Sequence, residues 1–456
     1  MNNLIHVLWD RISGIFIDKH ERSVKAKNNI AVSFVVRILS IVVSFLLVPL
    51  TIDYINPTRY GVWLTLSSII AWFGFFDIGF GNGLRNKFAE AVAQGKTELA
   101  RIYVSTTYAI LAIIIAVVFL IFFVISPLLD WSVILNTEPE MAEELGLLAM
   151  IVFLCFCVQF VLQLVDTVLA ANQEPAKASI ISFLGNLLSL IIIFVLTKTT
   201  SGNLVYLGTA IGISPVIILI LASVILYSKS YKPYAPSIKY VKFSHAKDLM
   251  ILGLKFFIIQ VSVVVLYQSS NIIIAQLFGP EQVTPYNLAY KYFGIIPMFF
   301  TIITTPYWSA ITDAWVRKDI EWIRTTMNNL MLVWAIVTCG TVVMLLGSNL
   351  FYRIWVGGEV SVPFRLSLVM AVYVIVNAWN GIFSVFLNGT GIIKLQYLAG
   401  IWGMILNIPM AIWLGRHVGV EGVVLSTVIL GAINMIWSYI QYKKNINFTA
   451  KGIWAK

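Results

Sequence analysis

Residues 103–126 read YVSTTYAILAIIIAVVFLIFFVIS, a run that contains no charged side chain. A helix needs about 20 consecutive apolar residues to cross the bilayer core, which is about 30 Å thick. The sequence therefore predicts an all-α polytopic membrane protein with about 12 transmembrane helices. The other apolar runs occupy residues 29–52, 61–84, 146–171, 178–197, 204–227, 249–278, 283–312, 328–347, 364–388, 395–415 and 420–442.

The composition of the whole chain supports this class. Of its 456 residues, 59% are hydrophobic and only 11% are charged, whereas soluble domains carry about 45–50% apolar and about 25% charged residues. There are too few polar residues to cover such an apolar excess in water. The net charge of +10 is typical of basic loops that alternate with membrane spans, so we expect no nucleic-acid partner.

The basic residues predict the topology. If the N-terminus is cytoplasmic, the segments on that side hold 23 of the 31 Lys and Arg residues, and the opposite side holds only 5. Such a bias follows the positive-inside rule. We therefore expect both termini and the basic segment 229–247 to be cytoplasmic.

The first 28 residues have a pattern of their own. Leu4, Ile5 and Leu8 recur at helical spacing, but Asp10 and Arg11 interrupt any signal-peptide core. This pattern predicts an uncleaved amphipathic helix in the membrane interface.

The sequence also contains an internal repeat. A shift of 223 residues aligns Pro57 with Pro280 and Arg101 with Arg324, and a looser match places Lys177 on Lys394. Because six spans separate the halves, the repeat is parallel, with an axis along the membrane normal. We expect two pseudo-symmetric six-helix lobes around a central cavity. The predicted segments are 1–28 (interfacial), 29–228 (N-lobe), 229–247 (linker), 248–442 (C-lobe) and 443–456 (tail).

Motifs for soluble chemistry are missing from the sequence. Gly95-Lys96-Thr97 ends like a phosphate-binding loop, but Glu90 stands where its first glycine belongs. The four histidines are scattered through flanking segments and loops, and no Ser/His/Asp set converges. We therefore predict no enzymatic activity, no cofactor and no metal site.

Polar side chains recur on one face of several spans, as with Gln159, Gln163 and Asp166 in the fourth. Such faces should point inward, where they serve either as interhelical hydrogen bonds or as the lining of a transport path. Packing is the simpler explanation for the serines and asparagines. A buried charge costs at least about 2.5–3.5 kcal/mol at the centre of a membrane, so Arg37 and Lys291 favour a cavity.

Lys255 lies near the start of its span, where its side chain could equally reach the interface. Asp77 and Asp166 could be counter-ions of the cations or carriers of protons. The cations outnumber these acids, which favours an anionic substrate. The substrate-binding candidates are Arg37, Arg85, Lys255, Lys291, Asn287 and Gln163, and the ion-coupling candidates are Asp77 and Asp166.

Four short segments resemble the polysaccharide flippases (O-antigen-type, Wzx-like) of the multidrug/oligosaccharidyl-lipid/polysaccharide exporter superfamily. They are Leu47–Leu50, Asn56–Trp63, Phe76–Arg85 and Gly419–Val423. The resemblance implies two six-helix lobes that enclose a central cavity, which opens alternately to either side of the bacterial cytoplasmic (inner) membrane. It also implies an undecaprenyl-pyrophosphate-linked oligosaccharide as cargo, coupling to an ion gradient, and contact with the lipid bilayer and other polysaccharide assembly proteins.

Two alternatives remain at this point. A cation-coupled multidrug exporter would share the fold, but acidic residues would be expected to dominate its cavity. A membrane glycan polymerase or ligase usually carries a large extracytoplasmic loop, whereas the longest predicted one here has about 20 residues. Lipid II flippases usually carry two extra helices, which makes peptidoglycan cargo the less favoured choice.

Overall fold

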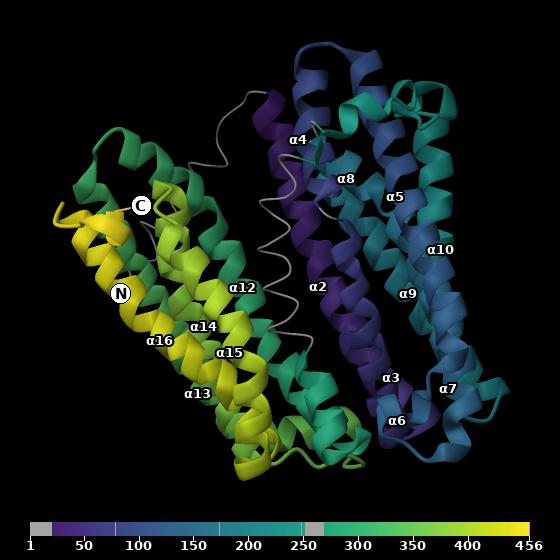
Figure 1. The fold of residues 1–456 in the computed structure, drawn as a ribbon. Coiled ribbons are helices and arrows are strands. Elements are labelled where there is room, and N and C mark those ends of the chain that lie inside the picture. The colour runs from purple at the N-terminus through teal and green to yellow at the C-terminus, as the bar shows by residue number, and fades with distance from the viewer. Residues whose placement is uncertain (1–20, 78, 173, 248, 251–268, 456) are drawn as a thin grey trace. The chain divides into compact units, whose positions relative to one another are not determined.

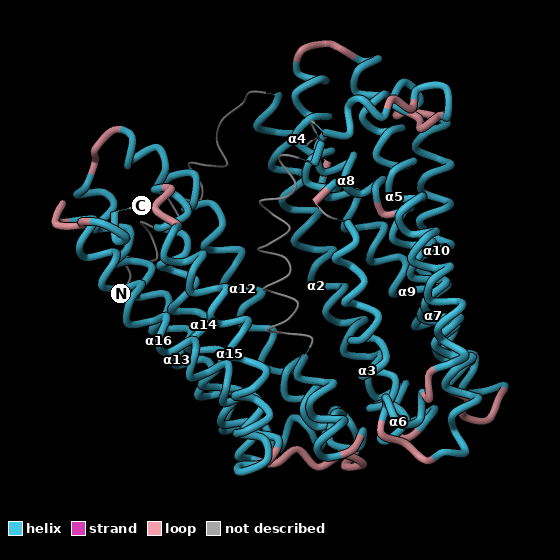
Figure 2. Tube along the Cα trace, viewed as in Figure 1, coloured by secondary structure: helices cyan, strands magenta, loops and turns pink. Residues whose placement is uncertain are grey.

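A computed structural model describes residues 21–77, 79–172, 174–247, 249–250 and 269–455. In this part of the chain the regular structure is helical and contains no strand (Figure 2). The all-α fold class is therefore confirmed. The long helices are α2 (Glu21–Ile55), α5 (Thr97–Ile125), α7 (Ala142–Leu162), α9 (Pro175–Thr199), α10 (Leu204–Ser228), α12 (Val283–Val316), α13 (Ile320–Val356), α14 (Phe364–Thr390), α15 (Lys394–Val418) and α16 (Val420–Ile446).

Nine helical stretches of the described residues are long and apolar enough to cross a membrane, so the chain is a multi-pass membrane protein. The predicted run 249–278 is represented by a helix at Ser269–Phe278; residues 251–268 lie outside the described residues, as does the predicted interfacial helix up to residue 20. The predicted number of about 12 spans stays a prediction. The run 61–84 is not continuous: it divides into α3 (Pro57–Ala71), the 3₁₀ turn η1 (Trp72–Asp77) and α4 (Phe80–Ala93).

The chain forms two compact units. The first contains Met1–Tyr54, Phe76–Leu129 and Glu144–Phe257, and the second contains Ile55–Phe75, Asp130–Glu143 and Ile258–Lys456. Segments 55–75 and 130–143 thus group with the second unit, although they precede residue 229. The predicted boundaries of the lobes remain a prediction, and the units are described separately below.

Hydrogen bonds explain why segment 130–143 belongs to the second unit. Gln276 donates from Nε2 to the carbonyl oxygen of Val133 (3.1 Å), and Asn136 donates from Nδ2 to that of Ala275 (2.8 Å). Both bonds attach the short helix α6 (Trp131–Leu135) and its following turn to the helix at Ser269–Phe278. Ala275 is fully buried, and buried backbone carbonyls need such partners.

In the first unit, α9 packs along α10, and α4 packs along α5 and α8 (Leu164–Ala171) (Figure 1). Phe153 of α7 is fully buried, and its ring lies 3.9 Å from that of Phe122 of α5, centroid to centroid. Gly185 permits close approach of α9 and α10, since a Cβ there would lie 3.2 Å from the Cα of Pro215. Small residues at such crossings are common in membrane helices, where tight packing drives association.

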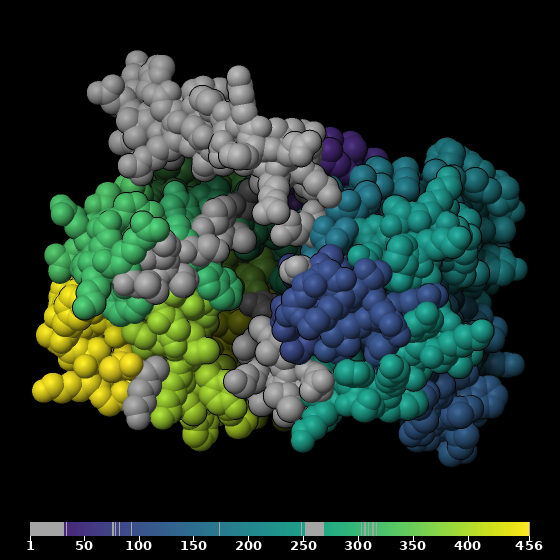
Figure 3. All heavy atoms as spheres, turned by 90° about the horizontal axis from the view of Figure 1, so that it is seen from above, coloured from purple at the N-terminus to yellow at the C-terminus, as the bar shows by residue number. Residues whose placement is uncertain are grey.

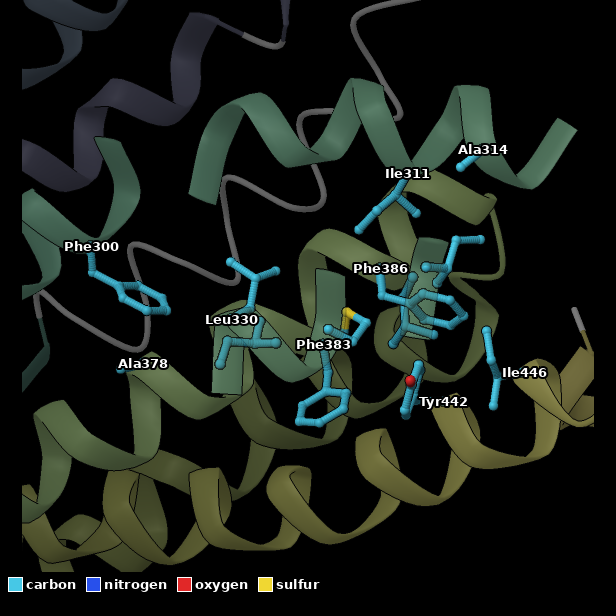
Figure 4. Packing of buried hydrophobic residues seen from close by; sticks show 13 residues of the cluster. Phe300, Ile311, Ala314, Leu330, Ala378, Phe383, Phe386, Tyr442 and Ile446 are labelled. Atoms are coloured by element: carbon cyan, nitrogen blue, oxygen red, sulfur yellow. The ribbon is translucent and has the colours of Figure 1, made fainter. Parts of the chain in front are cut away.

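The core of the second unit is an aromatic cluster (Figure 4). Phe383 and Phe386 of α14 are fully buried, and the ring of Phe386 meets that of Tyr442 of α16 edge to face, 5.0 Å between centroids. Ile311 of α12 and Leu330 of α13 complete the contact. Edge-to-face geometry suits the ring quadrupoles, so this cluster fixes four helices against one another.

The local backbone repeats with the offset found in the sequence. Helices α4 and α12 end at Ala93 and Val316, and the next helices begin at Thr97 and Ile320. Each pair is 223 residues apart. Gly95 and Lys318, at equivalent places in the two turns, both have positive φ, at 69° and 60°. The same holds for Asn56 and Gly279, at 73° and 92°, which precede Pro57 and Pro280. The internal repeat therefore has a counterpart in backbone conformation.

Candidate functional site

A polar cavity of about 250 Å³ lies inside the first unit, between the α7–α8 pair, α9 and α10. A single water needs only about 10–15 Å³ on this measure, so the cavity can hold several waters or an ion with its hydration. Its polar lining comes from Gln159, Gln163, Asp166, Ser182 and Asn186, and Pro215 lies beside them.

The helix break at Gln163 positions the acidic side of this cavity. Gln163 still donates its N–H to the carbonyl oxygen of Gln159 (2.9 Å), but its own carbonyl accepts from Asp166, three residues later (3.0 Å). The backbone thus tightens for one turn between α7 and α8. Such local tightening within a helix often marks a functional site. It places Gln163 and Asp166 on the cavity wall.

Pro215 shapes the opposite wall. It lies inside α10, and a proline within a helix removes one backbone hydrogen bond and frees the carbonyl four residues earlier. In membrane helices such groups are commonly resatisfied by neighbours or water. The cavity therefore lies between the tightened turn of α7–α8 and the proline within the continuous helix α10.

Asp166 has an unusual environment. Its Oδ1 atom is buried and has no hydrogen-bond partner among the described residues. A carboxylate at membrane depth is costly unless it is protonated, paired or hydrated. A cavity with room for water and with the amides of Gln163 and Asn186 on its lining supplies such an environment. This geometry suits reversible binding of a proton or a small cation.

Asp77 has a different role in the same unit. Its Oδ1 accepts a 2.9 Å hydrogen bond from the backbone N–H of Gly81, in the first turn of α4. A carboxylate at this place satisfies an N–H that the helix cannot and interacts favourably with the helix dipole. Asp77 therefore stabilises the start of α4 after the break in span 2, and its part in ion coupling remains a prediction.

The predicted cations are not gathered in this cavity. Arg37 on α2 and Arg85 on α4 are exposed on the first unit, and neither lines it. Lys291 lies on α12 of the second unit and is partly buried. Lys255 lies outside the described residues. The structure thus assigns Gln163 and Asp166, but none of these three described cations, to the cavity.

Asn287 belongs to a buried chain of side-chain hydrogen bonds in the second unit. Its Nδ2 donates to Oδ1 of Asn271 (2.7 Å) and to the carbonyl oxygen of Val283 (2.9 Å), and Asn271 donates onward to Ser68 of α3 (2.7 Å). This chain connects α3, the helix at Ser269–Phe278 and α12. Asn287 is therefore engaged in interhelical packing.

Sequence reasoning missed five residues of the cavity lining, namely the polar Ser182 and Asn186 and the apolar Ile181, Pro215 and Leu219. Ser182 and Asn186 are four residues apart on α9, so the spacing that identified the stripe on span 4 also holds here. The signal was present in the sequence. What the sequence did not contain was the contact of α9 and α10 with the break at Gln163.

The second unit departs from the first at the equivalent place. The looser repeat, with an offset of 217, places Asn380 at the position of Gln163 and buried Phe383 at that of Asp166. Asn380 donates from Nδ2 to the carbonyl oxygen of Gly431 (2.9 Å) and so bridges α14 and α16. The two halves therefore differ at this place in backbone and in chemistry, because α14 is continuous where α7 and α8 are separated at Gln163, and only the first half carries a carboxylate here.

Residues 26–312 match the family described as "Polysaccharide biosynthesis protein". The chain belongs to this family. It is 21% identical over 420 residues to a "Putative O-antigen transporter" of Salmonella typhi, covering 91% of this chain and 95% of the relative. It is 20% identical over 407 residues to a "Putative O-antigen export protein" of Yersinia pseudotuberculosis, covering 88% and 92%. The resemblance inferred from the four short segments is confirmed.

Two solved structures of transporters have a similar fold. An inward-facing multidrug-resistance MATE family transporter of the MOP superfamily matches with a TM-score of 0.76 at 13% identity, over 93% of this chain and 100% of that one. An outward-facing MATE transporter matches with a TM-score of 0.61 at 14% identity, over 94% and 96%. This family member therefore has a MATE-like transporter fold.

Proposed function

We propose that this family member is a flippase for an undecaprenyl-pyrophosphate-linked oligosaccharide. It moves the cargo from the cytoplasmic to the outer leaflet of the bacterial inner membrane by alternating access, and an ion gradient drives the cycle. Family membership and the names of the relatives support the cargo class. The single observation that carries the coupling is the buried, partnerless Oδ1 of Asp166 in a polar cavity of about 250 Å³.

The proposed coupling follows from electrostatics. Binding of a proton or cation at Asp166 neutralises a charge that is costly at membrane depth. Occupied and empty states of the cavity therefore favour different packing of α7–α8, α9 and α10. A ligand shifts a conformational equilibrium only through such differential affinity. The helix break at Gln163 and the backbone hydrogen bond that Pro215 cannot make supply places where the helices can repack.

The proposed cargo site uses cations outside this cavity. Guanidinium and ammonium groups bind phosphate oxygens by charge-assisted hydrogen bonds. The pyrophosphate would therefore pair with Arg37, Lys291 and Lys255. Arg85 would lie at the entrance of the predicted central cavity. Gln163 and Asn287 remain predicted contacts of the cargo. Gln163 also lines the cavity at Asp166, and Asn287 is already hydrogen-bonded to Asn271. The protein would require no cofactor, because translocation breaks no covalent bond.

The second candidate is a cation-coupled multidrug exporter, which the MATE-like fold favours. Deletion of the gene decides between them. If the protein is a flippase, cells without the gene should lose surface polysaccharide and accumulate the lipid-linked oligosaccharide in the cytoplasmic leaflet. Expression of the wild-type protein should reverse both effects. If the deletion leaves the glycan unchanged but raises drug sensitivity, the exporter is the correct function.

A further inference from the structure

Each unit continues past its last long helix into a segment that folds back on itself. In the first unit this segment is Ala235–Phe243, called here the linker strap. In the second unit it is Asn447–Ala455, called the tail strap. Both contain exposed apolar side chains next to lysines, and neither is used by the transport site proposed above.

The linker strap is attached to α5 by a set of specific bonds. Arg101 donates from Nε to the carbonyl oxygen of Ala235 (2.9 Å), and its guanidinium lies 4.2 Å from the ring centroid of Tyr240. Thr106, buried on α5, accepts from the N–H of Lys242 (3.0 Å). The strap therefore has a defined conformation on the end of α5. Figure 3 shows this end of the first unit, with the α4–α5 turn in dark blue and the linker in teal.

The tail strap uses the equivalent arginine. Arg324, 223 residues after Arg101, donates from Nη2 to Oδ1 of Asn447 (3.0 Å). The ammonium of Lys444 lies 4.2 Å from the ring centroid of Trp454, whose carbonyl accepts from Nδ2 of Asn445 (2.8 Å). Each strap thus combines an arginine contact near its start with a cation placed over an aromatic ring.

These attachments leave large apolar side chains uncovered. Ile238 is 92% exposed and Phe243 58% exposed in the linker strap, and Phe448 is 71% exposed in the tail strap. Phe448 also has φ of 54°, a left-handed conformation that bulky L-residues rarely adopt. Its ring stacks against that of Trp315 of α12, 6.4 Å between centroids, yet most of the side chain stays exposed. An aromatic residue held in a strained backbone with most of its surface exposed indicates a surface with a binding role.

Lysines accompany the apolar residues in both straps. Lys239 and Lys242 are exposed beside Ile238 and Phe243, and Lys451 is exposed in the tail strap. The linker strap begins within a few residues of the end of α10 at Ser228, and the tail strap directly after α16 ends at Ile446. Segments so close to the ends of membrane helices lie near the headgroup layer. Exposed apolar side chains with flanking lysines are the pattern that inserts at an anionic membrane surface.

We propose that the two straps are paired anchors for anionic phospholipid headgroups. In each, the apolar side chains enter the boundary between headgroups and acyl chains, and the lysines bind the lipid phosphates. The repeat places one anchor after each lobe, so each lobe holds its own contact with the leaflet. The proposal concerns the lipid leaflet and not the cargo, so its test needs no transport measurement.

The test measures the depth of spin labels. Nitroxides are attached to Ile238→Cys, Phe448→Cys and the control Lys96→Cys, each in full-length protein with Cys155, Cys157 and Cys339 replaced by alanine. Lys96 is exposed in the α4–α5 turn of the first unit. In nanodiscs containing phosphatidylglycerol, labels at 238 and 448 should collide more with oxygen than with an aqueous nickel chelate, and the label at 96 should do the reverse.

A charge comparison completes the test. In phosphatidylcholine nanodiscs the ratio of oxygen to nickel-chelate collisions at position 238 should move toward the aqueous value by up to about 25-fold, because each of the two lysines contributes about fivefold attraction to an anionic surface. The double variant Lys239→Gln, Lys242→Gln in phosphatidylglycerol should give the same shift, while the label at 448 stays unchanged. The proposal is overturned if labels at 238 and 448 match the label at 96, or if lipid charge has no effect. If the labels collide with the nickel chelate in nanodiscs but are shielded from it in native membranes, a protein partner covers the straps instead. That result also overturns the proposal.

Discussion

Thr284 Oγ1 donates a 2.7 Å hydrogen bond to the backbone carbonyl oxygen of Pro57. Pro57 and Pro280 begin equivalent segments of the internal repeat, because Pro57 opens α3 and Pro280 opens the turn that leads into α12. Thr284 lies four residues after Pro280. Further along α3, Ser68 accepts a hydrogen bond from Asn271 on the helix at Ser269–Phe278. The first part of span 2 is therefore packed against the second half of the sequence.

This packing predicts a steric requirement at Gly61. A Cβ at this position would overlap the carbonyl oxygen of Pro280, a backbone atom that cannot turn aside. We expect Gly61→Ala to destabilise the protein by about 1–3 kcal/mol, as overpacking usually does, and to lower the thermal midpoint of the detergent-purified protein. Gly347→Ala is the matched control, since its Cβ would meet nothing within 4 Å and alanine favours a helix. Equal midpoints for the two variants would refute the packing.

Ion coupling predicts a specific defect at Asp166. Asp166→Asn keeps the size and polarity of the side chain but removes the titratable charge. In proteoliposomes, gradient-driven translocation should fall at least about tenfold, while binding of cargo persists, because the substitution removes the group whose neutralisation drives repacking. Glu359→Gln, at an exposed carboxylate outside the cavity, should translocate normally. Full gradient dependence in Asp166→Asn would exclude this site from coupling.

The cargo cations predict an order of effects. Arg37→Lys should impair export although the charge is kept, because an ammonium cannot clamp phosphate with two parallel bonds, and Arg37→Ala should impair it more. Lys291→Arg should be tolerated better than Lys291→Ala. Surface polysaccharide is measured at equal membrane abundance of each variant. Full polysaccharide in both alanine variants would leave only a packing role for the two residues.

The topology is tested by labelling single cysteines in intact cells. Glu140 and Lys239 are suitable positions, because both are exposed on their own unit. Ser132 is a poor choice, since it is buried beside Asp130, to which its hydroxyl donates. An impermeant maleimide should react with Glu140→Cys and not with Lys239→Cys until the membrane is opened. Reaction at position 239 in intact cells would reverse the predicted orientation.

Part of the candidate site could be predicted because it depends on spacing along one helix. Gln159, Gln163 and Asp166 follow a helical face, and their stripe became one wall of the cavity. Asn287 belonged to a similar stripe, yet its amide is bonded to Asn271. Spacing alone does not distinguish a wall of a cavity from a contact between helices, because both require polar groups that face inward.

The sequence by itself determined the helical class, the repeat and several helix boundaries. Apolar length, proline at helix starts such as Pro57 and Pro280, and the turn around Gly95 are local properties, and backbone sterics and the bilayer act on them locally. Only the tertiary structure decided that α9 and α10 complete the cavity around Asp166, that Asp77 holds the start of α4, and that α3 packs with the second unit. These outcomes depend on close approach between segments far apart in sequence, as at Gly61 and Pro280, and such approach is set by the joint packing of many helices that no single stretch of sequence records.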